Sequence, residues 1–325
     1  MLFCSASTHE HSEQGGGRNY SRWSSFHDSP GANRKCTIEE RLTYTQNMCR
    51  TWYERNPVSE APYRNIFVDH KHKLLLCVPY KSGASTHLNL LAQNSDAVLN
   101  NEIPKEELDQ ILQSLSKKTS QKRVGIDNLN KIKSIERSKI LEEYYKVMVV
   151  RHPFVRILSM YSNKVAQYNQ DTHLWDCSDN HYGTGLTNWM QKKHPNRVGN
   201  CSLDMFVSYL LNNSKMFRLD MHTHLMHSWC NPCDISYDFI VRLETGDSDQ
   251  EYLLKNKINP NFNRILHENQ VLSRNVTSTD MFTRNLSQFR GVSDAQLEGL
   301  TQFYGEDLAM FGYEYDWFTH DTFLI

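Results

Sequence analysis

The chain has 325 residues, of which 39% are hydrophobic and 22% charged, ordinary values for a globular protein. Its formal net charge of −1 gives no overall basic field, which argues against nucleic acid as a partner. No apolar run reaches the roughly 18 residues that a membrane-spanning helix needs, so no part of the sequence is expected to cross a membrane.

Residues 1–35 are expected to be a disordered segment, and residues 36–325 to form one α/β domain. The first segment is rich in Gly, Ser, His and Asn and cannot bury enough apolar surface to become ordered. Residues 36–56 carry apolar side chains at roughly helical spacing, which predicts a helix. Residues 66–68 predict a short strand that runs into the first core strand.

Residues 74–87 predict a buried strand, a short loop and the start of a helix that ends near Ser95. Residues 74–78 are an apolar run, typical of a strand buried on both faces. The free N–H groups and dipole of a helix N-terminus favour anions, so the loop is a candidate phosphate cradle. The candidate cradle residues are Lys81, Ser82, Gly83, Ala84, Ser85 and Thr86. The Lys precedes the only Gly, so this is not a Walker A motif, and an ordinary helix start capped by Ser stays open.

Residues 103–115 predict an amphipathic helix with Pro104 in its first turn, and residues 135–145 predict another that leads into a second buried strand at 146–150. Arg151 then ends that strand, Pro153 suits the first turn of a helix, and Ser159 lies about two turns along. Open α/β sheets bind nucleotides at the carboxyl ends of parallel strands, so Arg151 and Ser159 are candidates for a second anion contact.

Residues 167–200 are polar and aromatic without periodicity, which predicts a long irregular insertion. Two interpretations stay open: a sugar-binding lid, and a surface loop packed by its own aromatic side chains. Farther on, the pattern predicts a helix at 203–211, a third strand at 237–243 and a late helix at 295–304.

Eight cysteines are present, and Cys77 in the buried strand is expected to be a free core thiol. The others are expected to pair in part if the chain reaches an oxidising compartment. Three interpretations stay open for Cys230 and Cys233: disulfides, a redox Cys-x-x-Cys motif, and zinc ligation. The histidines that would complete a zinc site are His222, His224 and His227.

The cradle and the segment from Arg151 to Ser159 together resemble the Golgi carbohydrate sulfotransferases, most closely those acting on N-acetylgalactosamine, chondroitin and dermatan. The first motif is Pro-(x)-Lys-small-small-Ser/Thr, and the second is Arg-x-Pro-Phe-x-Arg-Ile/Leu-x-Ser. The resemblance spans roughly residues 66–315. Its further segments are 220–222, 230–233, 237–240, 244–245 and 303–313.

This resemblance implies a P-loop-like three-layer α/β fold, with a mostly parallel sheet and helices on both faces. It implies 3′-phosphoadenosine 5′-phosphosulfate as co-substrate and no metal. Residues 81–86 would hold the 5′-phosphosulfate, while Arg151 and Ser159 would hold the 3′-phosphate. Lys81 would neutralise the charge on the leaving oxygen. Cys230 and Cys233 would have a disulfide role.

His222 matches the family's Asp-x-His and is the candidate catalytic base, since His accepts protons at neutral pH. Glu244 and His87 compete for that role, and a hydrogen-bonded core histidine stays open. The chain departs from the family where Tyr80 separates Pro79 from Lys81.

The resemblance implies a glycan or proteoglycan acceptor and a place in the Golgi lumen. Members of the family usually carry an N-terminal signal anchor, and no such segment is found in this sequence. We therefore expect the sequence to be a fragment or an isoform without the anchor. Contact with the membrane is expected only through such an anchor. Asn-x-Ser/Thr sequons compatible with a lumenal protein occur at Asn19, Asn200, Asn212, Asn275 and Asn285.

Two other functions stay open. One is a catalytically silent glycan-binding module on the same fold. The other is a P-loop kinase, which would need a Mg²⁺-binding carboxylate near the cradle, and Asp69 is the nearest candidate before the loop.

Overall fold

A computed structural model describes residues 37–53, 63, 65–115, 117–253, 256, 285 and 287–313. The expected disordered segment at 1–35 and the sequons at Asn19 and Asn275 lie outside the described residues. The described helix at the N-terminal side is α1 (Ile38–Tyr53), as the apolar spacing of residues 36–56 predicted.

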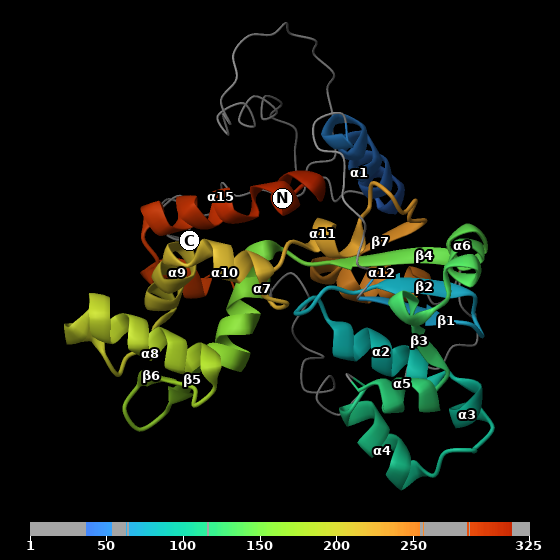
Figure 1. The fold of residues 1–325 in the computed structure, drawn as a ribbon, viewed down its shortest axis with the longest axis horizontal. Coiled ribbons are helices and arrows are strands. Elements are labelled where there is room, and N and C mark those ends of the chain that lie inside the picture. Colours follow the sequence, from blue (N-terminus) through green and yellow to red (C-terminus); the bar gives the residue numbers. More distant parts are fainter. Residues whose placement is uncertain are drawn as a thin grey trace, which may run out of the picture.

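A five-stranded sheet of order β3-β1-β2-β4-β7 forms the centre of the fold (Figure 1). Its strands are β1 (Ile66–Asp69), β2 (Leu74–Cys77), β3 (Ile126–Asn128), β4 (Tyr145–Val150) and β7 (Phe239–Arg242). β2, β4 and β7 run parallel, while β1 is antiparallel to both β2 and β3. The parallel part therefore brings the carboxyl ends of β2 and β4 together, as the two apolar runs predicted.

Helices cover both faces of this sheet, which confirms the predicted three-layer α/β fold. Leu74 and Leu76 of β2 point to one face, and Leu75 and Cys77 to the other, because strand side chains alternate. The first face is covered mainly by α2 (Ala84–Gln93), α4 (Lys105–Gln113) and α12 (Gly246–Leu253). The second is covered mainly by α1, α6 (Ser134–Glu143), α7 (Pro153–Met160), α11 (Met226–Cys230) and α15 (Asp294–Met310).

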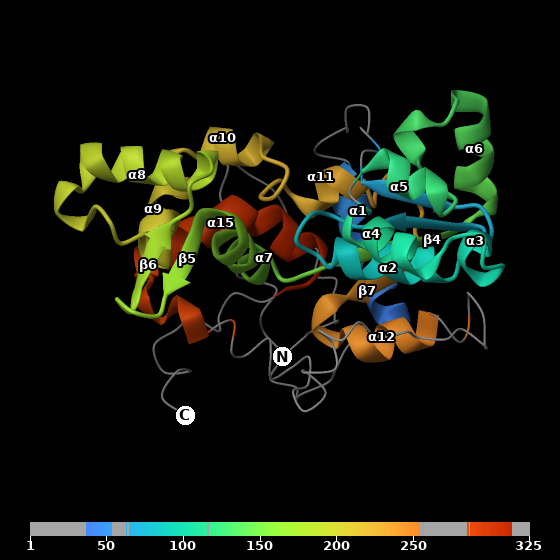
Figure 2. The same cartoon turned by 90° about the horizontal axis from the view of Figure 1, so that it is seen from below.

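A second, mainly helical lobe lies beside the sheet, and α7 and α15 connect the two (Figures 1 and 2). It contains β5 (Ala166–Asn169), β6 (Leu174–Cys177), α8 (His181–Lys193), α9 (Leu203–Asn212) and α10 (Ser214–Leu219). Residues 167–200 were expected to be irregular, and this was wrong. The two strands have four residues each, too short to show a period, and α8 contains two glycines that weaken the helical signal.

The aromatic side chains of this lobe pack on their own neighbours. The ring centroid of Trp175 lies 5.0 Å from that of Tyr161, and that of Trp189 lies 5.8 Å from that of Tyr209. Both partners lie outside residues 167–200, whereas Tyr168 and Trp175, with centroids 5.4 Å apart, pair within the segment, so it packs partly on its own aromatics and partly on the rest of the lobe.

Three disulfides join the described cysteines: Cys49–Cys233, Cys77–Cys230 and Cys177–Cys201. The disulfide role of Cys230 and Cys233 is confirmed, although each pairs with a distant cysteine rather than with the other. The expectation that Cys77 is a free thiol was wrong. A buried apolar run looks the same for a thiol and a half-cystine, and the partner of Cys77 lies 153 residues farther along the chain.

The remaining predicted helices and the third strand are present with shifts of a few residues at their ends. Short elements not predicted from the sequence are α3 (Asp96–Leu99), α5 (Lys118–Arg123), α10 and α11. Within the described ranges, every helix is too short or too polar to cross a membrane.

Candidate functional site

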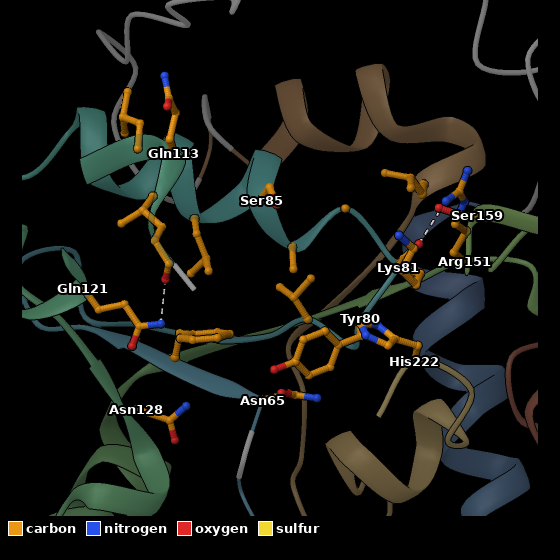
Figure 3. Close-up of a pocket in the computed structure, with 18 of the residues that line it drawn as sticks. Asn65, Tyr80, Lys81, Ser85, Gln113, Gln121, Asn128, Arg151, Ser159 and His222 are labelled. Carbon is orange, nitrogen blue, oxygen red and sulfur yellow. Dashed lines mark hydrogen bonds between the residues drawn. The ribbon is translucent and has the colours of Figure 1, made fainter. Parts of the chain in front are cut away.

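A cavity of about 570 Å³ opens at the carboxyl end of β2 and extends toward α4, α5 and β3 (Figure 3). The described side chains around it include Lys81, Lys131 and Arg151 but no Asp or Glu. Its other polar lining residues are Asn65, Tyr80, Ser85, Gln113, Gln121, Asn128, Asn130, Ser159 and His222. The charge of this lining suits an anionic ligand.

The candidate cradle is a tight turn between β2 and α2. The Ser82 N–H donates to the Pro79 carbonyl at 3.1 Å, and Lys81 and Gly83 both have left-handed backbones, with φ of 68° and 82°. A Cβ on Gly83 would also come within 3.2 Å of Leu243, so glycine suits this position for two reasons. A left-handed Lys costs on the order of 1 kcal/mol or more, and such strain is concentrated at functional sites.

The predicted cradle residues do not all face the cavity. Lys81, Gly83, Ala84 and Ser85 line it. The Ser82 hydroxyl is fully buried and lies 3.8 Å from the Met226 sulfur, and the Ser82 N–H is bonded to the Pro79 carbonyl, so Ser82 shapes the turn rather than facing the cavity. Thr86 is half-buried and is not among the residues that line the cavity.

Arg151 and Ser159 lie beside Lys81 at one end of the cavity (Figure 3). The Arg151 Nη1 donates to the Lys81 carbonyl at 2.9 Å, so the second predicted anion contact is tied directly to the first. Burial lowers the pKa of the Arg151 guanidinium, and the nearby Glu244 carboxylate partly opposes this effect.

Lys81 is an unusually acidic lysine. Burial, followed by the positive charges of Lys164 and Arg151, lowers its pKa to about 8. Lys164 was missed in the sequence, although it follows Ser159 by only five residues. Crowding of positive charge without a compensating acid is typical of an anion-binding site.

His222 also lines the cavity, next to Tyr80. The two rings meet edge to face with their centroids 5.2 Å apart. Asp220 accepts from the His222 backbone N–H at 2.8 Å and from the Tyr182 hydroxyl, which fixes the segment that carries His222. Burial lowers the pKa of the imidazole, as do the nearby cations, while Asp220 partly opposes them. The ring is therefore neutral at pH 7 and able to accept a proton.

The two competing bases are held in other contacts. His87 is buried, and its Nδ1 lies 2.9 Å from the Gly83 carbonyl. Glu244 accepts from the His152 backbone N–H at 2.7 Å and from the Tyr313 hydroxyl at 3.0 Å. Of the three candidates, His222 is the one that lines the cavity.

The cysteine and histidine cluster is dispersed in the fold. Cys230 and Cys233 form disulfides, and His227 Nδ1 lies 3.0 Å from the Asp307 carboxylate. The part of the chain that the structure describes contains no group of three or more metal-ligating side chains.

A fully buried Arg156–Asp307 pair lies behind the cradle, with 3.7 Å between Nη1 and Oδ2. Arg156 donates to the Tyr80 carbonyl at 3.3 Å and to the His224 carbonyl at 3.0 Å, so it links the cradle to the segment that carries His222. Asp307 accepts from the backbone N–H groups of Met226 and His227. Both residues stood in the motifs quoted above, but their pairing could not be read from the sequence.

Comparison with known proteins gives the family. A model described as "Sulfotransferase family" matches residues 64–314, which is most of the chain. "Carbohydrate sulfotransferase 10" of Pongo abelii is 29% identical over 229 residues, covering 66% of this chain and 60% of the relative. "Carbohydrate sulfotransferase 11" of Rattus norvegicus is 24% identical over 273 residues, covering 80% of this chain and 70% of the relative.

"Carbohydrate sulfotransferase 9" of Homo sapiens is 26% identical over 234 residues, covering 67% of this chain and 47% of the relative. The chain thus spans about 60% of the length of the first of these curated relatives. No solved structure matches it significantly. Because the family model covers well over half of its length, the chain belongs to the sulfotransferase family.

Proposed function

We propose that this protein transfers the sulfuryl group of 3′-phosphoadenosine 5′-phosphosulfate to a hydroxyl of a glycan. The observation that carries the proposal is the end of the cavity where Lys81, Arg151 and Ser159 meet. Family membership supports the reaction, and the carbohydrate sulfotransferases among its relatives support a glycan acceptor. The finer acceptor class, a chondroitin- or dermatan-like or N-acetylgalactosamine-containing glycan, rests on the resemblance of the motifs.

Two separate anion contacts suit this donor better than ATP. The backbone N–H groups at the start of α2 and the Lys81 ammonium are placed for the 5′-phosphosulfate. Arg151, with its fork of N–H donors, and Ser159 are placed for the 3′-phosphate. No carboxylate lines the described cavity, and carboxylates are the usual protein ligands of the Mg²⁺ that accompanies ATP.

The kinase alternative loses its candidate magnesium ligand. Asp69 pairs with Leu74 in the sheet, at the end of β2 opposite to the cradle. Its carboxylate also lies 2.6 Å from His72 Nδ1. Asp69 is therefore too far from the cavity to bind the Mg²⁺ of a nucleotide there.

In the proposed reaction, His222 takes the proton of the acceptor hydroxyl as its oxygen attacks sulfur. The bond between sulfur and the bridging oxygen breaks, and its electron pair leaves with adenosine 3′,5′-bisphosphate. Lys81 stabilises the negative charge that grows on that oxygen, and the cradle holds the departing phosphate in line.

Turnover of labelled donor against a panel of glycans tests the proposal, with Lys81→Ala as the informative variant. We expect kcat to fall on the order of a hundredfold, as happens when one preorganised donor is lost. Calorimetric affinity for adenosine 3′,5′-bisphosphate should fall much less, because Arg151 and Ser159 remain. Bisphosphate binding without turnover of any acceptor would favour the silent glycan-binding module instead.

The compartment follows from the same proposal. Three disulfides among the described residues suit an oxidising lumen rather than a reducing cytosol. We therefore place the protein in the Golgi lumen, where the donor and nascent glycans would be available to it.

A further inference from the structure

The end of the cavity away from Lys81 has buried polar groups that the proposed donor site does not use. Asn65, whose exposed fraction is 5%, has a side-chain Nδ2 with no hydrogen-bond partner among the described residues. The Oδ1 of Asn130 is likewise buried without a partner there. Both residues line the cavity. Because buried polar atoms are nearly always paired, these two are expected to bind water or a ligand.

Tyr80 separates this end from the anion-binding end. In Figure 3, its ring lies between Lys81 and the side chains of Asn65, Gln121 and Asn128. Tyr80 is 36% exposed, and the edge-to-face contact of its ring with His222 fixes the orientation of the ring. An exposed aromatic ring beside polar groups can contact the apolar face of a sugar while its neighbours bind the hydroxyls.

We propose that Asn65, Asn130 and Tyr80 form the acceptor subsite, and that the subsite selects a neutral sugar rather than a uronic acid. This inference rests on the proposed sulfotransferase function. The unpaired atoms are one N–H donor and one carbonyl acceptor. A sugar hydroxyl or acetamido group satisfies both. A carboxylate only accepts hydrogen bonds, so it would leave the Asn130 oxygen facing negative charge.

Asn130 and Asn65 are placed firmly by the backbone around them. The Asn130 N–H donates to the Asn128 Oδ1 at 3.2 Å, which holds the turn after β3. The Asn65 carbonyl accepts from the Val78 N–H at 3.1 Å, three residues before Lys81, so Asn65 lies beside the segment that leads into the cradle. Lys131, exposed at the rim, is the one Lys or Arg next to these carboxamides among the described lining residues.

The test compares Asn65→Ser and Asn130→Ser with the wild-type protein, using neutral N-acetylgalactosamine-terminated and uronic-acid-terminated disaccharides. We expect the wild type to prefer the neutral acceptor. Each variant should raise the KM for it about tenfold, the loss expected for one hydrogen bond to a buried group. kcat and the calorimetric affinity for adenosine 3′,5′-bisphosphate should stay within about twofold. Asn196→Ser, at an exposed asparagine in the short turn after α8, is the matched control and should change neither value.

Three outcomes would overturn the inference. The first is an unchanged KM in both variants, and the second is a wild-type preference for the uronic acid. The third is a loss of bisphosphate affinity, which would place the adenine ring at these carboxamides. If the wild type turns over no acceptor, the proposed function fails separately. The subsite is then judged by binding of the same disaccharides in the presence of the bisphosphate, and equal binding by wild type and variants would refute it.

Discussion

Lys81 combines three properties that seldom occur together in a surface lysine. Its backbone is left-handed, its carbonyl accepts from Arg151, and its ammonium lies near two other cations. The left-handed backbone and the crowding of cations cost free energy in the free protein, whereas the hydrogen bond from Arg151 holds the strained residue in place. A dianionic ligand would relieve the charge repulsion, which supports the proposed donor site.

The pH dependence of catalysis follows from two side chains. In the proposed reaction His222 must be neutral to accept a proton, and burial lowers its pKa from the ordinary value of 6.5. Lys81 must be charged, and its pKa is lowered to about 8. We therefore expect kcat/KM to rise with pH through a value below 6.5, and to fall again near pH 8. A pH–rate profile measured with acceptor and donor concentrations well below their KM values checks this expectation.

Substitutions assign the two limbs of that profile. Lys81→Arg should move the alkaline limb to much higher pH, because a guanidinium does not lose its proton in this range. His222→Gln should remove the acid limb along with most of the activity. An alkaline limb that stays near pH 8 in Lys81→Arg would assign that titration to another group.

Arg151 gives a prediction about ligand selectivity. Arg151→Ala should weaken binding of adenosine 3′,5′-bisphosphate by about 1.5–3 kcal/mol, the range for hydrogen bonds to charged groups. AMP lacks the 3′-phosphate and should lose little affinity. Isothermal calorimetry with both nucleotides makes the comparison, and equal losses for the two would remove Arg151 from the 3′-phosphate contact.

The cradle is held in place by a buried ion pair, Arg156 and Asp307, whose side chains are not among those that line the described cavity. Arg156 of α7 and Asp307 of α15 are both fully buried, and through their hydrogen bonds they join the Tyr80 carbonyl to the start of α11. Burial raises the pKa of the Asp307 carboxyl, but hydrogen bonds and charge from His227 and Arg156 outweigh it, and the pKa is lowered overall. The carboxylate is therefore ionised and depends on these partners.

Removal of one member of this pair should be strongly destabilising. Arg156→Met should lower the free energy of unfolding by about 3–5 kcal/mol, because Asp307 would remain as an uncompensated buried charge. The double variant with Asp307→Leu should recover part of that loss. Denaturant unfolding with the disulfides intact measures both.

The exposed ion pair between Arg123 and Glu107 is the control for this prediction. Its Nε–Oε1 distance is 3.1 Å, and its side chains are 50% and 40% exposed. Arg123→Met should leave the unfolding midpoint close to that of the wild type, because exposed ion pairs contribute little to stability. Similar losses at both sites would mean that Arg156 contributes only apolar packing.

The elements around the cradle were predictable because their signals are local. An apolar run predicted the buried strand β2, and a glycine predicted the tight turn at Gly83. A proline predicted the first turn of α7 at Pro153. In the second lobe α9 was predicted, but β5, β6 and α8 were not, because the strands are short and α8 contains two glycines. Asn65 precedes β1 and Asn130 follows β3, and the two residues line one cavity because β1 and β3 pair in the folded sheet. The sequence alone does not show this pairing.

The disulfides tie the outer layer of the fold to the cradle strand. Cys77 ends β2 and pairs with Cys230 at the end of α11, while Cys233, just beyond, pairs with Cys49 of α1. Replacement of both Cys77 and Cys230 by Ala should cost about 2–4 kcal/mol of stability. It should also weaken bisphosphate binding, because Lys81 lies four residues after Cys77.

Thermal unfolding and calorimetry check this prediction, with the Cys177→Ala/Cys201→Ala variant as control. That disulfide joins residues only 24 apart and lies in the second lobe, so its loss should leave bisphosphate affinity unchanged. Peptide mapping without reduction should recover Cys77 joined to Cys230. Equal effects of the two double variants on affinity would show that the Cys77–Cys230 bond does not support the cradle.

The long spacing of these bonds sets an order of events during biosynthesis. Cys77 is made 153 residues before its partner, and Cys49 is made 184 residues before its own. At a synthesis rate of about 5–20 residues per second, the thiol of Cys77 waits roughly ten to thirty seconds for Cys230 to emerge. During that interval a cellular thiol oxidase can pair it with a nearer cysteine instead, with the two electrons passing to the oxidase. Correct maturation should therefore depend on a disulfide isomerase, and the yield of active protein should fall sharply in cells depleted of one.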